Sequence, residues 1–424
     1  MGIHKFYTWL YSKHQDCFLQ EATTKLIYNN IYIDVNYLLH TSIFKSYTEE
    51  IFKDTLFKNL DILLSNYVAT KRIILAVDGS SPYAKILLQR KRRQLSQVNS
   101  QVQPASNKLS SMNLTTGTDF MKKIDNYLKE YATRLKQNYK FLQPEIILIP
   151  SSEPNEGEIK LFKKVLDYGK LDLKETHLII GNDADLVLLA MSVKPITNMY
   201  ILIRLNKKSH ILSINKMITN NFKNRQDFVI LSMFMGNDYL PKLKFMNFDR
   251  LWRVYTRTNQ INIKKHTLLD NKTFNKEHLI KYFTNLVLDL PKRYIKFSIQ
   301  NYNKEKIINY LEGVLWCYNM YSSGVCTMYD YIYKFKTSVS AIEILMFLLT
   351  EEQDINIPVS DAPAIDSNIY TLLVVPKSSR NIIPKKYHKL LDNELSYIFE
   401  DNREFTVKDI DSIVKITCNN NASN

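Results

Sequence analysis

The sequence predicts an α/β protein with a mostly parallel sheet flanked by helices, followed by a mainly helical C-terminal part. Apolar segments that end in an acid indicate the strands, over residues 31–34, 72–78 and 177–183. Longer stretches with helical periodicity separate these segments, and such alternation is typical of a parallel α/β sheet. From about residue 250 onward the apolar pattern is mainly helical, with many Tyr and Lys residues.

The pattern also predicts how the chain is organised. We expect residues 1–250 to form the α/β core and residues 251–418 to form a mainly helical part packed against it. Residues 95–114 are rich in Ser, Gln and Asn and lack periodicity, so we expect a flexible loop there. The polar residues 419–424 are expected to be a disordered tail.

The composition is that of a soluble globular protein, with 45% apolar and 23% charged residues in a chain of 424. No apolar run is long enough to cross a bilayer, and the first residues lack the apolar core of a signal peptide. The four cysteines are scattered without zinc-site spacing. We therefore expect a cytoplasmic protein with reduced thiols. The net charge of +15 favours a polyanionic partner, although a Lys-, Asn- and Ile-rich chain from an AT-rich genome shows the same bias.

Seven acids lie in apolar or glycine-containing settings, and five of them follow apolar runs. They are Asp34, Asp78, Glu156, Glu158, Asp183, Asp185 and Asp238. Because the carboxyl ends of parallel strands meet at one edge of a sheet, we expect Asp34, Asp78 and Asp183 to be neighbours. Clustered buried carboxylates repel one another and require cations, and hard oxygen ligands select Mg²⁺ or Mn²⁺.

Two such ions about 4 Å apart can activate water and stabilise the leaving oxygen of a phosphodiester, so the acids indicate a two-metal nuclease. The alternative is that each acid is only an N-cap or a turn residue.

A basic helix face follows Asp78 and the loop Gly79–Pro82. This face contains Lys85, Gln89, Arg92 and Arg93, because the last three follow Lys85 by four, seven and eight positions. Guanidinium groups can bind a phosphate in bidentate fashion while Gln89 supplies a neutral donor. The alternative is a solvated basic helix, or a basic run over Arg90–Arg93 that resembles a nuclear-localisation signal.

A series of motifs in this order resembles the Xrn family of 5′→3′ exoribonucleases. The motifs occupy residues 1–6, 34–40, 78–85, 89–93, 115–121, 156–158, 183–186, 236–241, 310–318 and 376–384. Three positions depart from the family pattern: His4 replaces a Pro, Asn155 a Gly and Ile159 a His. None of these departures removes a predicted ligand.

The resemblance implies a PIN/flap-nuclease-like fold in which all seven acids bind two Mg²⁺ ions, with Mn²⁺ as a substitute. It also implies that Lys85, Gln89, Arg92 and Arg93 bind a 5′-monophosphate, and that His40 and Trp316 stack on bases. Stacking suits this role because an aromatic face holds any base. The alternative for Trp316 is a core aromatic, and for His40 a satisfied strand-end histidine.

We therefore expect a monomeric 5′→3′ exoribonuclease that hydrolyses 5′-monophosphorylated single-stranded RNA to nucleoside 5′-monophosphates. The expected setting is cytoplasmic RNA and mRNA decay downstream of a decapping enzyme, with a cytoplasmically replicating virus as the source. One alternative is a flap endonuclease acting on DNA, but no glycine follows Asp238 over residues 239–250, where those enzymes carry a Gly-rich DNA-binding turn. A catalytically inactive RNA-binding protein is the other alternative, and the retention of all seven acids argues against it.

Overall fold

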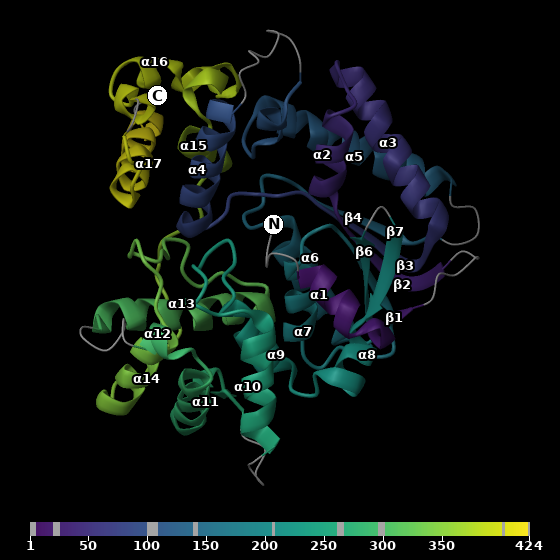
Figure 1. Ribbon diagram of the computed structural model, residues 1–424. Coiled ribbons are helices and arrows are strands. Elements are labelled where there is room, and N and C mark those ends of the chain that lie inside the picture. The colour runs from purple at the N-terminus through teal and green to yellow at the C-terminus, as the bar shows by residue number, and fades with distance from the viewer. Residues whose placement is uncertain are drawn as a thin grey trace. The chain divides into compact units, whose positions relative to one another are not determined.

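The computed structural model describes residues 6–19, 26–99, 109–138, 143–205, 208–260, 267–295, 302–400 and 403–422. Most of the opening motif, residues 1–5, lies outside these ranges. The chain forms two compact units whose segments interleave in sequence (Figure 1). The helical unit contains Met1–Leu19, Asp183–Met199 and Arg204–Asp361, and the sheet unit contains Gln20–Asn182, Tyr200–Ile203 and Ala362–Asn424. The functional division at residue 250 stays a prediction.

Parallel strands form the centre of the sheet unit. They are β2 (Leu26–Asp34), β3 (Tyr67–Ala76), β4 (Glu145–Ile149) and β5 (His177–Ile180), in the order β5-β2-β3-β4. The strand β6 (Met199–Leu205), whose residues 200–203 belong to this unit, follows β5 in the sheet. All three pairings among β2 to β5 are parallel, and every residue of β5 is buried. The predicted α/β class with a mostly parallel sheet is confirmed.

Helices of the sheet unit connect these strands or follow them. They are α2 (Val35–Ile43), α3 (Glu49–Asn66), α4 (Tyr83–Asn99), α5 (Asp119–Asn138), α6 (Gly157–Gly169), α15 (Ser367–Val374), α16 (His388–Asp392) and α17 (Val407–Ala422). Short 3-10 turns lie at Ser111–Leu114, Lys377–Ile382, Lys385–Tyr387 and Ser396–Phe399. Figure 1 shows α4, α15 and α17 beside one another, and α2, α3 and α5 grouped together.

Two predicted irregular segments are partly helical. The helix α4 continues to Asn99, into the segment predicted as a loop, because Leu95 and Gln97 favour a helix and no Gly or Pro lies in residues 95–99. The helix α17 likewise reaches Ala422, into the predicted tail, since no Gly or Pro interrupts it. Residues 100–108 and 423–424 lie outside the described residues.

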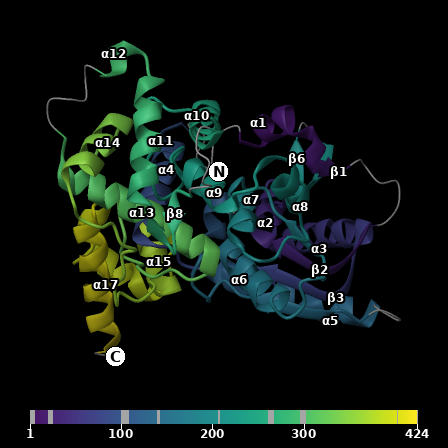
Figure 2. The ribbon, with the colours of Figure 1, turned by 90° about the horizontal axis from the view of Figure 1, so that it is seen from below.

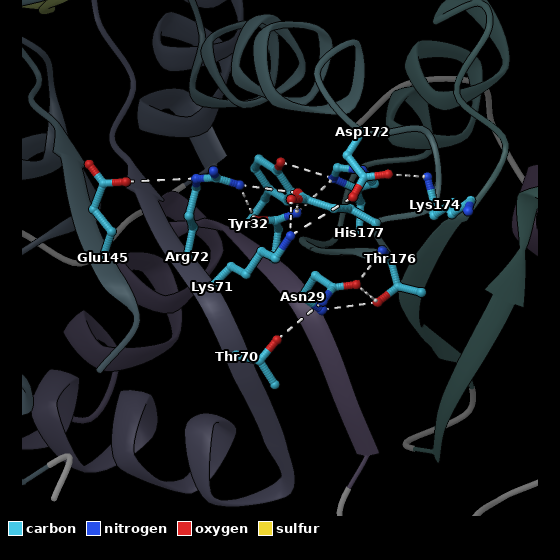
Figure 3. Close-up of polar contacts among 12 residues, drawn as sticks. Asn29, Tyr32, Thr70, Lys71, Arg72, Glu145, Asp172, Lys174, Thr176 and His177 are labelled. Carbon is cyan, nitrogen blue, oxygen red and sulfur yellow. Dashed lines mark hydrogen bonds and ion pairs between the residues drawn. The ribbon is translucent and has the colours of Figure 1, made fainter. Parts of the chain in front are cut away.

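A row of polar side chains crosses the sheet four residues before the carboxyl end of β2 (Figure 3). In the strand register, Asn30 pairs with Arg72 and with His177, and Arg72 pairs with Glu145. Glu175 accepts a 2.6 Å hydrogen bond from Asn30 and lies 2.6 Å from Lys71 Nζ and 3.1 Å from Arg72. These contacts compensate the charge of a carboxylate that is only 5% exposed, and they fasten β2, β3 and the start of β5.

The helical unit consists mainly of short and medium helices. They are α1 (Phe6–Lys13), α7 (Asp185–Ser192), α8 (Ile214–Lys216), α9 (Arg225–Met233), α10 (Phe248–Gln260), α11 (Lys276–Leu288), α12 (Lys292–Ile295), α13 (Lys304–Ser323) and α14 (Ala341–Thr350). A 3-10 turn lies at Gln15–Cys17 and a π-helical turn at Met217–Asn221. Here β1 (Phe18–Leu19) pairs antiparallel with β7 (Lys208–Ser213), and β8 (Leu269–Asp270) pairs with β9 (Thr273–Phe274).

The packing of the helical unit centres on α11 and α13. Figure 2 shows α11 with α14 nearby, and α11 also contacts α10, while α13 contacts α7, α9 and α14. Beyond residue 250, the strands within the described ranges are the two-residue β8 and β9, so the predicted helical character is confirmed. Across the described residues, no helix combines the length and the apolar character that a membrane span requires.

Candidate active site

Two of the predicted acids lie at or just past the carboxyl ends of neighbouring parallel strands. Asp34 is the last residue of β2 and caps α2, because its Oδ1 accepts a 3.0 Å hydrogen bond from the Asn36 amide. Asp78 follows β3 by two residues, and its Oδ1 accepts a 2.7 Å hydrogen bond from the Gly157 amide. The structure therefore brings Asp34 and Asp78 to the same edge of the sheet, as the sequence predicts.

Gly157, at the start of α6, lies against both carboxylates. A Cβ atom at this position would lie 3.2 Å from Asp34 Oδ1 and 3.3 Å from Asp78 Oδ1. Both oxygens thus face the same small space, and glycine leaves that space open. The amino end of α6 also favours negative charge there through its backbone dipoles.

The acids on either side of Gly157 are buried. Glu158 is 8% exposed, in the first turn of α6. Glu156 is 5% exposed, and its Oε2 lies 2.8 Å from Lys85 Nζ on α4. The predicted ligand Glu156 is therefore in an ion pair with a residue of the predicted phosphate-binding face.

Carboxylate oxygens that converge on an open space suit a hard divalent cation such as Mg²⁺ or Mn²⁺. The space beside Gly157 fits this requirement, since two carboxylate oxygens border it. Within the described ranges, no group of three or more His, Cys, Asp or Glu side chains is close enough to hold a metal ion. Asp34 and Asp78 thus supply a pair of oxygens rather than a complete coordination shell.

Lys160 supports the Asp78 turn and was not among the predicted site residues. Its Nζ donates to the carbonyl oxygens of Val77, at 2.7 Å, and Pro150, at 2.9 Å. Burial lowers the pKa of this amine to about 8, while the charge of Asp78 acts in the opposite direction. A lysine between Ile159 and Leu161 on a buried helix was the only sequence signal for this role.

The basic helix is not simply solvated. Lys85 and Arg90 are buried, and Arg93 is half-buried, while Arg92 is exposed. Burial lowers the pKa of Arg93, whose Nη1 donates to Thr115 Oγ1 at 2.5 Å. Arg90 points elsewhere, and it donates to the carbonyls of Leu373, at 2.8 Å, and of Ile398.

His40 lies on α2 with its side chain open to solvent. The pKa of its imidazole is lowered because surrounding protein partly desolvates the ring, and the charge of Arg93 adds to this effect. The charge of Asp78 raises the pKa. The ring therefore lies within the electrostatic reach of both the acidic edge and the basic face.

The other predicted acids belong to the helical unit, where aromatic hydroxyls position two of them. Asp183 Oδ1 accepts a 3.2 Å hydrogen bond from the Asp185 amide, and the Asp183 carbonyl accepts one from the Tyr7 hydroxyl. The buried Asp185 accepts a 3.1 Å bond at Oδ2 from the Tyr321 hydroxyl on α13. Sequence reasoning did not identify Tyr321, which no motif marks.

Asp238 is 6% exposed and lies within a turn, which Asn237 stabilises by accepting from the amides of Tyr239 and Leu240, both at 2.9 Å. Trp316 is fully buried in the same unit. Its ring stacks on Tyr331, with centroids 4.6 Å apart, and meets the edge of Tyr239 at 5.3 Å. This is what the core-aromatic alternative predicts, and base stacking by Trp316 requires that the cluster open first.

Residues 1–204 match the family model described as the XRN 5′-3′ exonuclease N-terminus. This segment of the chain is therefore similar to the XRN N-terminal domain. The matched segment contains every predicted acid except Asp238 and all four residues of the predicted phosphate-binding face.

The chain is also similar to curated proteins that are named 5′-3′ exoribonucleases. It is 26% identical over 304 residues to 5′-3′ exoribonuclease 1 of Saccharomyces cerevisiae. The alignment covers 59% of this chain and 20% of that protein. It is 28% identical over 217 residues to the Homo sapiens 5′-3′ exoribonuclease 1, and this alignment covers 45% of this chain and 13% of that protein. The similarity to both thus spans less than a quarter of the relative. Among solved structures, the catalytic core of Rad2 in complex with a DNA substrate aligns with a TM-score of 0.40 and 14% identity, over 82% of this chain and 94% of that chain.

Proposed function

We propose that the chain is a divalent-cation-dependent 5′→3′ exoribonuclease that degrades single-stranded RNA from a 5′-monophosphate end. The observation that carries this proposal is the 2.8 Å ion pair between Lys85 and Glu156. It joins a basic helix face to the acidic edge beside Gly157 within one unit. A bound phosphate at that face would therefore lie beside carboxylates that suit a cation.

The chain's own residues then have distinct tasks. Lys85, Gln89, Arg92 and Arg93 bind the terminal phosphate, with Arg93 oriented by Thr115. His40 stacks on a terminal base, which holds the strand without reading its sequence. Fixing the end in this way sets which phosphodiester is cut and gives the reaction its direction.

The proposed cation ligands are the acids that the resemblance implies. They are Asp34, Asp78, Glu156 and Glu158 of the sheet unit and Asp183, Asp185 and Asp238 of the helical unit. Two Mg²⁺ or Mn²⁺ ions bound by such carboxylates would supply an activated water and neutralise charge on the leaving oxygen. Lys160 holds the turn that presents Asp78.

The proposed setting is the cytoplasm, where a decapping enzyme would supply the 5′-monophosphate ends that this pocket selects. A cap or a triphosphate is too large and too highly charged for a site that holds one phosphate. The proposal includes a monomeric enzyme of viral origin that takes part in mRNA decay.

Incubation with a 5′-phosphorylated single-stranded RNA tests this proposal. With Mg²⁺ the chain should release nucleoside 5′-monophosphates from the 5′ end, and chelation should stop the reaction. The Asp78→Asn variant should bind RNA without cleaving it. Faster cleavage of a DNA flap of the same sequence would support the flap-endonuclease alternative, and binding without cleavage would support an RNA-binding protein.

A further inference from the structure

Tyr370 of α15 reaches the basic face from a distant part of the chain. Its hydroxyl donates to Gln89 Oε1 at 2.9 Å, and it also lies 2.9 Å from Ser81 Oγ. Tyr370 is 2% exposed, and all three residues belong to the sheet unit. Residue 370 lies beyond residues 1–204, which match the family model.

These contacts have a direction. A tyrosine hydroxyl has one proton, and an amide oxygen can only accept. Because Gln89 Oε1 takes the proton of Tyr370, Ser81 must donate to the tyrosine oxygen. The Gln89 oxygen is then occupied, and the amide NH₂ group is left to donate to another acceptor.

The surroundings of Tyr370 are cationic. Burial is the largest effect on its hydroxyl and raises the pKa to about 12. The hydrogen bond with Ser81 and the charges of Arg93 and Lys85 lower the pKa, and the charge of Glu156 raises it. The hydroxyl therefore keeps its proton at neutral pH and remains a donor. Gln89 lies within a group of cations where an anion is the complementary ligand.

The backbone around Tyr370 is held in place on both sides of the residue. Arg90 of α4 donates to the carbonyls of Leu372, at 3.4 Å, and Leu373, at 2.8 Å. Gly117 packs so tightly against Ser367 that a Cβ atom there would lie 1.7 Å from the Ser367 carbonyl oxygen. The position of the hydroxyl relative to α4 is thus fixed by contacts at both ends of α15.

We propose that Tyr370 is a positioning residue that orients the Gln89 amide so that its NH₂ group faces the terminal phosphate. This inference rests on the proposed function, and it adds a specificity element from a segment outside the matched domain. A glutamine that is free to turn would present its oxygen to the phosphate part of the time, and two acceptors repel. The hydroxyl of Tyr370 excludes that orientation.

RNA binding, measured under conditions that prevent cleavage, tests this inference. The dissociation constants of one oligoribonucleotide with a 5′-phosphate and with a 5′-hydroxyl are measured in the presence of EDTA. Tyr370→Phe keeps the buried ring and removes only the hydroxyl, so it should fold. It should reduce the preference for the 5′-phosphate by about threefold to tenfold, the range for one hydrogen bond. In a Gln89→Met background it should cause no further reduction, because the group it positions is gone.

Tyr387→Phe is the matched control. Tyr387 is buried in the same C-terminal segment, and its hydroxyl has no hydrogen-bond partner within the described part of the chain. This variant should keep the wild-type preference. An unchanged preference in Tyr370→Phe, or an equal reduction in both backgrounds, would overturn the inference. A wild-type chain that does not distinguish the two ends would overturn the proposed function itself, and the inference with it.

Discussion

Lys85 Nζ and Glu156 Oε2 form a 2.8 Å ion pair between side chains that are 9% and 7% exposed. Removal of one partner leaves an uncompensated buried charge, so Lys85→Met should lower the free energy of unfolding by about 3 kcal/mol. The double variant Lys85→Met/Glu156→Gln should recover part of that loss. Urea denaturation of the wild type, both single variants and the double variant measures this coupling, and strictly additive losses would show that the pair does not interact.

Tyr321 is expected to affect catalysis through Asp185. Its hydroxyl donates to Asp185 Oδ2, so Tyr321→Phe should lower kcat/KM on RNA by about fivefold, the effect of roughly 1 kcal/mol. Tyr310→Phe is the control on the same helix, because the Tyr310 hydroxyl is buried with no hydrogen-bond partner in the described residues. Equal activity losses in the two variants would argue against a specific role for Tyr321.

Trp316 should contribute mainly to stability. Since its ring is buried against Tyr331 and Tyr239, Trp316→Ala should lower the free energy of unfolding by about 3 to 5 kcal/mol. Trp316→Phe retains a ring and should lose less. Both are measured by denaturant unfolding together with RNA binding under conditions where each variant is folded. A variant that keeps its stability but loses about 1 to 3 kcal/mol of binding energy would instead support base stacking.

His177 should make the fold sensitive to acid. Its imidazole accepts or donates a 3.0 Å hydrogen bond with the Tyr32 hydroxyl, and burial lowers its pKa from 6.5 to about 4. Below the unfolded pKa, the unfolded chain binds a proton that the folded chain does not. Stability should therefore fall as the pH drops from 6.5 to about 4, by up to about 3 kcal/mol.

The control for this prediction is His177→Asn, which keeps a hydrogen-bonding group near Nδ1 without a titratable ring. Unfolding curves at about pH 7 and about pH 5 should show a smaller pH effect in this variant than in the wild type. The same acid sensitivity in both proteins would assign it to groups other than His177. Glu175 does not interfere with this comparison. Burial raises its pKa, but its contacts with Lys71, Asn30 and Arg72 more than offset this effect and lower the pKa from 4.5, so its stabilisation is lost only at more acidic pH.

Topology explains why part of the site could be predicted. Strands buried on both faces are recognisable as apolar runs, and the parallel order places Asp34 and Asp78 at one edge. The open space beside Gly157 follows from three-dimensional packing, but the acids around it were identifiable from their motifs.

Other features could not be predicted, because they depend on contacts between distant segments. Nothing local to Tyr370 indicates that it meets Gln89, which lies 281 positions away in the chain. Helical periodicity likewise predicts that Trp316 lies on an apolar helix, but it does not decide whether other side chains bury the ring. Lys160 was overlooked because its two acceptors are backbone carbonyls, which have no sequence signature.

The central claim is that a 5′-monophosphate on RNA is the feature that the chain selects. The most direct measurement compares initial degradation rates of one single-stranded RNA with a 5′-phosphate and with a 5′-hydroxyl, alongside a DNA of the same sequence. Charge-assisted contacts from the basic face should make the phosphorylated RNA the best substrate, by about tenfold or more. Equal rates on the two RNA ends, or faster degradation of the DNA, would contradict the account.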